Sequence, residues 1–167
     1  MNHPRFIVDN NVGRLAVWLR VLGYDTIFIN PIADSELLEI AQREQRVVLT
    51  KDTGIMQRRL VASGTIEAYL VKGSDWRAQL AQVMKAYRLD ASGQFTRCVR
   101  CNGVLEARDK EAVRQHVPPM VYRIQEEFFA CPGCGRHYWQ GSHWQRMSRA
   151  VHHILQHRSA LAGEAAG

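Results

Sequence analysis

The stretch RFIVDNNVGRLAVWLRVLGYDTIFIN, residues 5–30, decides the fold of the first half of the chain. Residues 5–8 predict a short buried strand that ends at Asp9. Residues 12–22 repeat apolar side chains at helical spacing, and they do so almost all round the helix, which predicts a largely buried element. Gly23 is suited to end that helix, and residues 25–29 predict a second strand.

The alternation of strands and helices continues to about residue 90. The further elements are expected in this order: a helix from Asp34 or Ser35, a strand over 46–50, a helix over 53–61, a strand over 68–71 and a helix from about Asp75. Strands that alternate with helices in this way predict a three-layer α/β domain with a mainly parallel sheet.

Carboxylates follow three of these predicted elements. Asp9 comes directly after the first strand, Asp52 lies two residues beyond the third, and Asp34 and Glu36 begin the helix after the second. Ligands of open parallel sheets collect where the strands end, and clustered carboxylates suit Mg²⁺ or Mn²⁺. One or two such ions can activate a water against a phosphodiester. The alternative is that Asp34 and Asp52 only cap their helices.

Other catalytic signatures do not occur in this half. No strand-to-helix turn carries G-x-G-x-x-G or the phosphate-binding loop G-x-x-x-x-G-K-[ST], and the G-x-S-x-G pattern of serine hydrolases is missing from the sequence. Basic residues near the predicted acids are Arg14, Arg20 and Lys51. We expect them to contact phosphates, or to neutralise the acid cluster.

The second half contains all four cysteines of the chain, as Cys98-Val-Arg-Cys101 and Cys131-Pro-Gly-Cys134. Two residues separate the sulfurs of each pair, so that one tight turn directs both thiolates at a single ion. Two disulfides or a redox C-x-x-C motif are the alternatives. A closed set of four thiolates predicts structural Zn²⁺, which would stabilise a ribbon too poor in large apolar residues to fold alone.

The chain therefore divides into three predicted parts. Residues 1–92 form the α/β domain, residues 93–157 a zinc ribbon with a C-terminal helix, and residues 158–167 a flexible tail. Residues 90–94 are polar and small and are expected to link the first two parts.

The net charge of the 167-residue chain is +6, and the excess is concentrated in the second half. Ten Lys and Arg residues stand against six Asp and Glu residues from position 97 onward. This balance favours a polyanionic partner, above all a nucleic acid, although a solvated basic surface without a partner is the simpler alternative.

Aromatic and basic residues alternate around the second cysteine pair. Aromatic rings stack on unpaired bases and arginines bind phosphates, as expected for single-stranded RNA. The alternative is that most of these rings form the core of the ribbon. The residues expected to bind RNA here are Arg136, His143 and Trp144, and His143 could instead reach the acid cluster.

Several ordered motifs resemble the mut-seven C-terminal RNase domain family, a PIN-like group. They are Asp9-Asn-Asn-Val-Gly-Arg-Leu-Ala-Val-Trp-Leu-Arg-Val-Leu-Gly-Tyr-Asp25, Asp34-Ser-Glu-Leu-Leu, Val48-Leu-Thr-Lys-Asp52 and Cys131-Pro-Gly-Cys-Gly-Arg-His-Tyr-Trp-Gln-Gly-Ser-His-Trp144. The resemblance spans about residues 5–147. It implies a PIN-like α/β/α nuclease domain with an appended zinc ribbon.

The resemblance also implies that Asp9, Asp34 and Asp52 match acidic metal-binding positions. Many PIN-like sites hold a fourth acid after a late strand, for which Asp75 is the nearest residue here. The second acid is often a glutamate on a helix, so Glu36 competes with Asp34 for that role.

Together these observations predict a metal-dependent ribonuclease that cleaves endonucleolytically, with catalytic Mg²⁺ or Mn²⁺, structural Zn²⁺ and a ribbon that aids RNA binding. The alternative is a non-catalytic RNA-binding or ribosome-associated module on a nuclease fold. A third class is a toxin-like module with a protein inhibitor.

The cellular setting is predicted from two further observations. No apolar run approaches the roughly 18 residues that span a bilayer, so no membrane partner is expected. The first nine residues resemble the start of a strand more than a signal peptide, and paired cysteines without an export signal fit the reducing cytoplasm.

Overall fold

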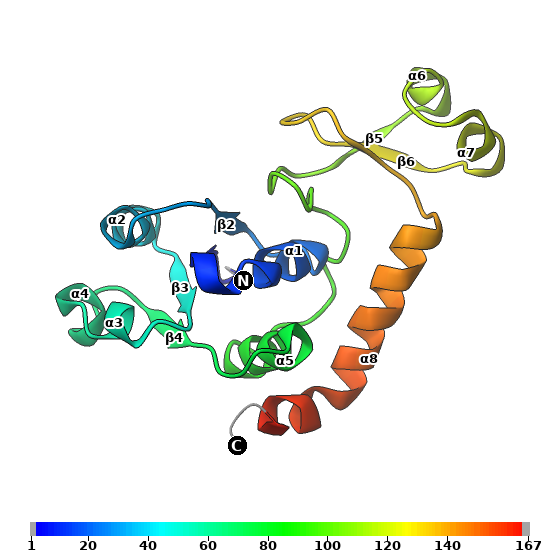
Figure 1. The fold of residues 1–167 in the computed structure, drawn as a ribbon. Coiled ribbons are helices and arrows are strands. Elements are labelled where there is room, and N and C mark those ends of the chain that lie inside the picture. Colours follow the sequence, from blue (N-terminus) through cyan, green and yellow to red (C-terminus); the bar gives the residue numbers. More distant parts are fainter. Residues whose placement is uncertain (1–2, 165–167) are drawn as a thin grey trace.

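A computed structural model describes residues 3–164 of the chain. Its first half is built on a four-stranded sheet with strand order β2-β1-β3-β4, in which all neighbours are parallel (Figure 1). The strands are β1 (Phe6–Val8), β2 (Thr26–Phe28), β3 (Val47–Thr50) and β4 (Ala68–Leu70). The predicted α/β class with a parallel sheet is confirmed.

Helices cover both faces of this sheet, as the sequence predicted for three layers (Figure 1). One hydrophobic cluster joins the sheet to α1 (Arg14–Val21) and α5 (Trp76–Ala86). A second cluster joins the other face to α2 (Asp34–Glu44), α3 (Thr53–Met56) and α4 (Arg59–Ala62). Phe6 and Val8 point into the first cluster and Ile7 into the second, because successive side chains of a strand face opposite sides.

Two predicted helices differ in detail from the observed elements. The helix expected over residues 12–22 begins with a separate 3₁₀ turn, η1 (Asn10–Val12). The helix expected over residues 53–61 is two short helices, because Arg58 takes an extended conformation (φ −60°, ψ 137°) between α3 and α4.

The end of α1 is a point of close approach between two parts of the chain. Gly23 follows the helix with φ +94°, and a Cβ atom there would lie 2.1 Å from the carbonyl oxygen of Gly93. The amide of Phe95 donates to the carbonyl of Val21 at 2.7 Å. Only glycine at position 23 lets the linker pack this tightly against α1.

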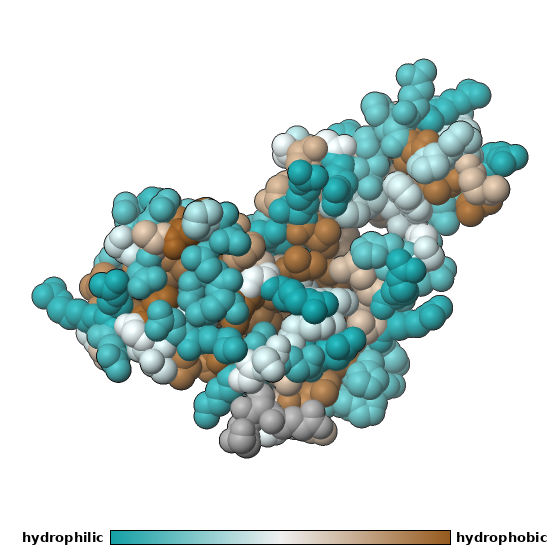
Figure 2. All heavy atoms as spheres, in the orientation of Figure 1, coloured by the Kyte–Doolittle hydropathy of each residue, from teal (hydrophilic) through white to brown (hydrophobic). Residues whose placement is uncertain are grey.

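The second half contains a three-stranded antiparallel sheet in the order β5-β6-β7. Its strands are β5 (Glu106–Arg108), β6 (Phe128–Ala130) and β7 (His137–Tyr138), and two helices, α6 (Lys110–Val113) and α7 (Pro119–Ile124), lie between β5 and β6. A small cluster of Val113, Val117 and Phe128 forms its core. This ribbon projects from the α/β domain, and Figure 2 shows hydrophobic atoms gathered near its far end.

The last helix, α8 (Ser142–Glu164), returns to the α/β domain and packs along α5. Val151 and Ile154 are buried in the cluster that also contains α1 and α5, and Leu161 and Ala162 pack against it. The expected flexible tail from residue 158 thus differs from the structure, in which α8 continues through residues 158–164. Residues 165–167 of that tail lie outside the described residues. Within residues 3–164, no helix is both long and apolar enough to cross a bilayer.

Candidate functional site

The strand order places a topological switch point between β1 and β3. The chain leaves β1 toward β2 on one side, and it continues from β3 toward β4 on the other. Open α/β sheets bind ligands at such a point, outside the carboxyl ends of the strands. We call this side of the sheet, where its four strands end, the carboxyl edge, and the side where they begin the amino edge.

Asp9 stands at the carboxyl edge immediately after β1 and is 6% exposed. One carboxylate oxygen, Oδ1, accepts from the amide of Asn10 at 2.7 Å. The other, Oδ2, accepts from the hydroxyl of Thr50 at 2.7 Å. A carboxylate has about four acceptor positions, so each oxygen keeps a lone pair for a further ligand.

Thr50 connects Asp9 to Asp52 across the switch point. Its buried Oγ1 donates to Asp9 and accepts from the amide of Asp52 at 2.9 Å. The exposed Asp52 side chain also accepts from the amide of Gly54 at 2.7 Å, so the alternative that Asp52 caps a helix is realised at α3. The sequence interpretation missed Thr50, although a hydroxyl residue ending a strand before Lys51-Asp52 was a usable signal.

Asp34 and Glu36 occupy the first turn of α2. The cap of this helix is Ala33, which makes no side-chain cap, so Asp34 does not have the capping role considered for it. Instead, Oδ2 of Asp34 lies 3.3 Å from Nη2 of Arg58, in a partly exposed ion pair. Glu36 is exposed. The pairing with Arg58 follows from the packing of α2 near α4, and sequence reasoning missed it.

Asp75 lies in the loop after β4, on the same edge of the sheet. It caps α5 by accepting from the amide of Ala78 at 3.3 Å, and it lies 3.8 Å from Nη1 of Arg77. Within residues 3–164, the four cysteines are the only group of three or more potential metal ligands whose atoms all lie within 4.8 Å of one another. The acids of the carboxyl edge are therefore neighbours in the fold without forming a closed cluster.

Two asparagines fix the turn that follows Asp9. Nδ2 of Asn10 donates to the carbonyl of Ile32 at 3.1 Å, and Oδ1 of Asn11 accepts from the amide of Lys51 at 3.2 Å. The turn is thereby tied to the segments that carry Asp34 and Asp52. Neither asparagine was singled out from the sequence, although both directly follow Asp9.

The three basic residues expected near the acids have different surroundings. Lys51 is exposed beside Asp52. Arg14 is exposed in the first turn of α1, with its guanidinium 5.1 Å from the ring of Trp76. Arg20 is buried at the other end of α1, where it donates to main-chain carbonyls. Because its guanidinium is enclosed in this way, we leave Arg20 out of the proposed RNA-binding surface.

The four cysteines meet in one group, and none is in a disulfide. Sγ of Cys98 lies 3.6 Å from Sγ of Cys134, and Sγ of Cys101 lies 3.3 Å from Sγ of Cys131. Four thiolates bound tetrahedrally at about 2.3 Å from Zn²⁺ lie about 3.8 Å apart. The donor set and its spacing thus fit a zinc ion after a small adjustment.

The surroundings of the thiols also suit a metal. The hydroxyl of Tyr138 lies 3.0 Å from Sγ of Cys98, and a Cβ atom at Gly103 would lie 2.9 Å from Sγ of Cys131. Burial opposes ionisation of Cys98, but hydrogen bonds from Tyr138 and from the turn backbone lower the pKa of this thiol to about 6. At Cys101 the backbone of Gly103 acts to lower the pKa, but burial and hydrogen bonds with the neighbouring thiols together raise it. Only a glycine fits at position 103 without displacing a ligand.

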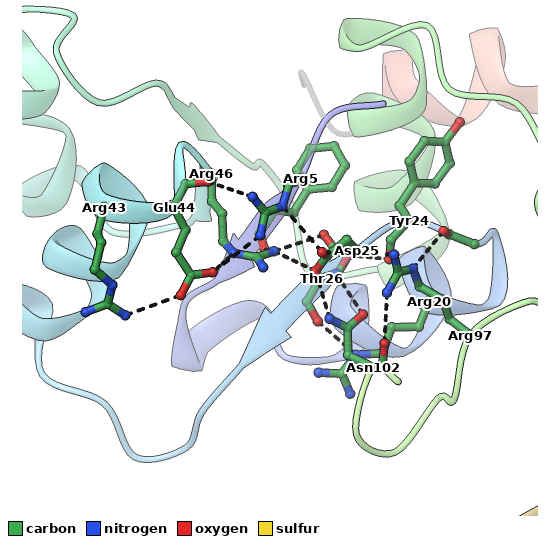
Figure 3. A network of polar contacts seen from close by, with 12 residues as sticks. Arg5, Arg20, Tyr24, Asp25, Thr26, Arg43, Glu44, Arg46, Arg97 and Asn102 are labelled. Carbon is green, nitrogen blue, oxygen red and sulfur yellow. Dashed lines mark hydrogen bonds and ion pairs between the residues drawn. The ribbon is translucent and has the colours of Figure 1, made fainter. Parts of the chain in front are cut away.

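A polar network fastens the first cysteine turn to the amino edge of the sheet (Figure 3). Asn102, with φ +71°, donates to Oδ1 of Asp25 at 2.8 Å and accepts from the amide of Thr26 at 3.0 Å. Arg20 donates to the carbonyls of Val99 and Arg100, both at 3.0 Å. We call these contacts, which Asn102 and Arg20 make between the first cysteine turn and the sheet, the knuckle clamp.

The knuckle clamp and the acids lie at opposite edges of the sheet. Thr26 is the first residue of β2 and pairs with Phe6, whereas Asp9 follows Val8 at the far end of β1. Arg136, His143 and Trp144 do not join the acids; they line a cavity between the linker, β7 and the start of α8. The expectation that His143 could reach the acid cluster is not met in this arrangement.

Comparison with known proteins gives one match. The family model described as the Mut7-C RNAse domain matches residues 4–151, which is most of the chain. No curated protein and no solved structure matches it.

Proposed function

The chain belongs to the Mut7-C RNAse domain family, and we propose that it is a metal-dependent ribonuclease that cleaves RNA phosphodiesters endonucleolytically. The family gives the class of reaction. The single observation that supports a site for it is the chain of contacts from Asp9 through Thr50 to Asp52 across the switch point.

We propose that Asp9 and Asp52 would hold Mg²⁺ or Mn²⁺, with Asp34 as a third ligand when Arg58 turns away to solvent. Carboxylate oxygens are the donors that these ions prefer, and Asp9 retains free lone pairs. When bound, such an ion activates water and neutralises charge on the phosphate. Glu36 and Asp75 are further acids of this edge that could complete the coordination.

The residues around the acids are suited to hold the RNA backbone. Lys51 is exposed beside Asp52, and Arg14 is held over the ring of Trp76, which itself stacks on Trp18 at 4.2 Å. A guanidinium fixed in this way can bind a phosphate without losing much side-chain freedom. The four unpaired thiols fit a reducing compartment, for which we propose the cytoplasm.

The test is cleavage of a labelled single-stranded RNA by Asp9→Asn, with Mn²⁺ or Mg²⁺ and with the metal omitted. We expect the variant to lose about 100-fold or more in rate, the order of magnitude for loss of one group that stabilises a transition state. Asp109→Asn is the matched control, because Asp109 is exposed in the ribbon and makes no side-chain cap. Equal cleavage by wild type and Asp9→Asn, with both folded by circular dichroism, would refute the proposal.

A second candidate function is an RNA-binding module without turnover. One observation favours it: the atoms of Asp9, Asp34 and Asp52 are not gathered as closely as the cysteine ligands among the described residues. This candidate predicts RNA binding that weakens steeply with salt, but no cleavage with either metal. The same cleavage assay therefore distinguishes the two.

A further inference from the structure

A cavity of about 640 Å³ lies between the linker, the ribbon and the start of α8. Five aromatic residues contribute to its walls: Phe95, Phe129, Tyr138, Trp139 and Trp144. Ligand sites are typically concave, mainly apolar and of this size, with a few polar groups that orient the ligand.

Basic side chains line the cavity, and within residues 3–164 no carboxylate does. The basic side chains are those of Arg97, Arg136, His137 and His143. Arg97 is engaged in the fold, since it donates to the carbonyls of Gly23 and Asn102. Arg136 and His143 are exposed, so they are available to an anion at the rim.

The walls are fixed by contacts on three sides. Phe95 has φ +60°, an uncommon conformation for an aromatic residue, and its amide is held by Val21. The ring of Phe95 lies 4.7 Å from that of Trp144, and the hydroxyl of Tyr138 contacts Cys98 of the zinc site. A cavity built from such constrained rings loses little entropy when it binds a planar group.

We infer that this cavity binds one unpaired base of an RNA strand, while Arg136 and His143 contact the adjoining phosphates. Aromatic rings beside basic groups, without any acid, suit a base joined to a phosphate. This inference rests on the proposed function in taking RNA as the ligand, and it assigns the base to a defined place.

The location of the cavity has a consequence for substrate length. Its linker wall lies against the last turn of α1, whereas Asp9 precedes the first turn, and α1 with its eight residues is about 12 Å long. One strand must therefore run along the domain to occupy both places. Short oligomers reach one place only, and longer oligomers gain affinity by reaching both.

The first experiment uses tryptophan fluorescence. The chain has four tryptophans, of which Trp139 and Trp144 line the cavity and Trp18 and Trp76 stack elsewhere. Adenosine or uridine hexaribonucleotides are titrated without added Mg²⁺ or Mn²⁺. We expect quenching in wild type and in the control Tyr122→Phe, whose residue lies in α7 outside the cavity, and a smaller quench in Trp144→Phe. Equal quenching in Trp144→Phe and Tyr122→Phe would place the base elsewhere and overturn the inference.

The second experiment measures RNA affinity by fluorescence anisotropy. Trp144→Leu removes the ring, and we expect its affinity to fall about five- to 150-fold, as the loss of one base stack implies. Arg136→Glu changes the rim charge, and Arg123→Glu on α7 is the control with the same charge change. We expect only Arg136→Glu to bind clearly more weakly.

An abasic hexamer separates base binding from charge alone. We expect it to bind more weakly than the hexaribonucleotides and to show no sensitivity to Trp144→Leu. Equal binding of abasic and normal hexamers, or equal effects of Arg136→Glu and Arg123→Glu, would show a diffuse basic surface and overturn the inference.

Cleavage assays distinguish the failure of this inference from that of the proposed function. Cavity variants are expected to raise KM and leave kcat unchanged, whereas Asp9→Asn is expected to lower kcat and leave binding in the cavity intact. RNA cleavage with unaltered KM in Trp144→Leu would overturn the cavity alone. Cavity-dependent binding without cleavage would support the cavity and refute the nuclease.

Discussion

The carboxylates at the two edges of the parallel sheet have different hydrogen-bond and ion-pair partners. At the amino edge, Asp25 accepts from Arg46 at 2.7 Å and from Asn102 at 2.8 Å, and Arg5 and Arg97 lie nearby. At the carboxyl edge, Asp9 accepts from one hydroxyl and one amide. The acid surrounded by cations holds the structure together, and the acid without a cation is left with a position for a ligand.

The surroundings of Asp25 also shift its pKa in the direction expected for a structural carboxylate. Its partial burial alone would raise the pKa of this carboxyl, but hydrogen bonds from Arg46 and Asn102, with the charges of Arg46 and Arg97, lower it to about 2. Arg46 itself is buried and also contacts Glu44 at 2.8 Å. The amino edge is thus a closed set of charges that joins the sheet to the first cysteine turn.

We propose that the four cysteines hold structural zinc, and its removal should disrupt the amino edge more severely than any single substitution there. Structural zinc contributes about 10–16 kcal/mol to the folding of zinc-finger peptides, so we expect the chelated protein to lose the ribbon while the parallel sheet persists. Hydrogen exchange measured on the full chain checks this: protection should fall in β6 and β7 and remain in β1 and β3. Unchanged protection of β6 after zinc loss, verified by metal analysis, would contradict the assignment.

Asp25→Asn should lower the stability that the amino edge provides and leave the proposed chemistry of the carboxyl edge intact. The change leaves buried Arg46 without its main partner, which we expect to lower the free energy of unfolding by about 2–4 kcal/mol. RNA cleavage below the unfolding temperature should remain close to wild type, in contrast to Asp9→Asn. Urea unfolding measures the free energy of unfolding, and an RNA cleavage assay measures the rate. Loss of cleavage in a fully folded Asp25→Asn protein would contradict the different roles that we assign to the two edges.

The pH dependence of stability offers a smaller effect from the same residue. Because the folded pKa of Asp25 is below its unfolded value of 3.8, its stabilisation is present above about pH 4 and is lost as the pH falls toward 2. After allowance for solvent screening, we expect a loss of about 1–2 kcal/mol. Urea unfolding between pH 5 and pH 2, compared with Asp25→Asn, checks this; parallel curves for the two proteins would assign the loss to other groups.

Thr50→Val should weaken the carboxyl edge with little effect on the fold. The substitution keeps the shape of the side chain but removes the hydroxyl between Asp9 and Asp52. Groups that orient a metal ligand typically affect metal affinity or activity about 10–100-fold, and we expect a change near the lower limit. The metal concentration for half-maximal cleavage measures it, with Thr65→Val as a control in an exposed turn. If the metal concentration for half-maximal cleavage is unchanged in Thr50→Val, Thr50 has no role in the proposed metal site.

Local patterns in the sequence were sufficient for most of the α/β domain. Apolar periodicity located the strands and helices, and the order of elements placed Asp9 and Asp52 at one edge. The cysteine spacing predicted the group of four thiols. These features could be predicted because each depends on a short stretch or on a general rule of parallel sheets.

The features that the sequence did not predict depend on contacts between residues far apart in the chain. The contacts of Arg20 with Val99 and Arg100 join residues about 80 positions apart, and no local pattern on the helix of Arg20 indicates them. The bond between Asn102 and Asp25 has no local signal either. The sequence predicts a flexible tail from residue 158, whereas α8 packs on α5 and continues through residues 158–164.

Because Arg108 pairs with Phe128, the segment between these two residues is a module that can be exchanged. These residues stand opposite each other where β5 ends and β6 begins, so a tight turn could replace residues 109–127 without changing the path of either cysteine turn. Such a shortened chain would need a polar residue in place of Phe128, whose packing partners Val113 and Val117 would be gone. The same junction offers a position at which a foreign peptide or reporter domain can be inserted far from both edges of the sheet.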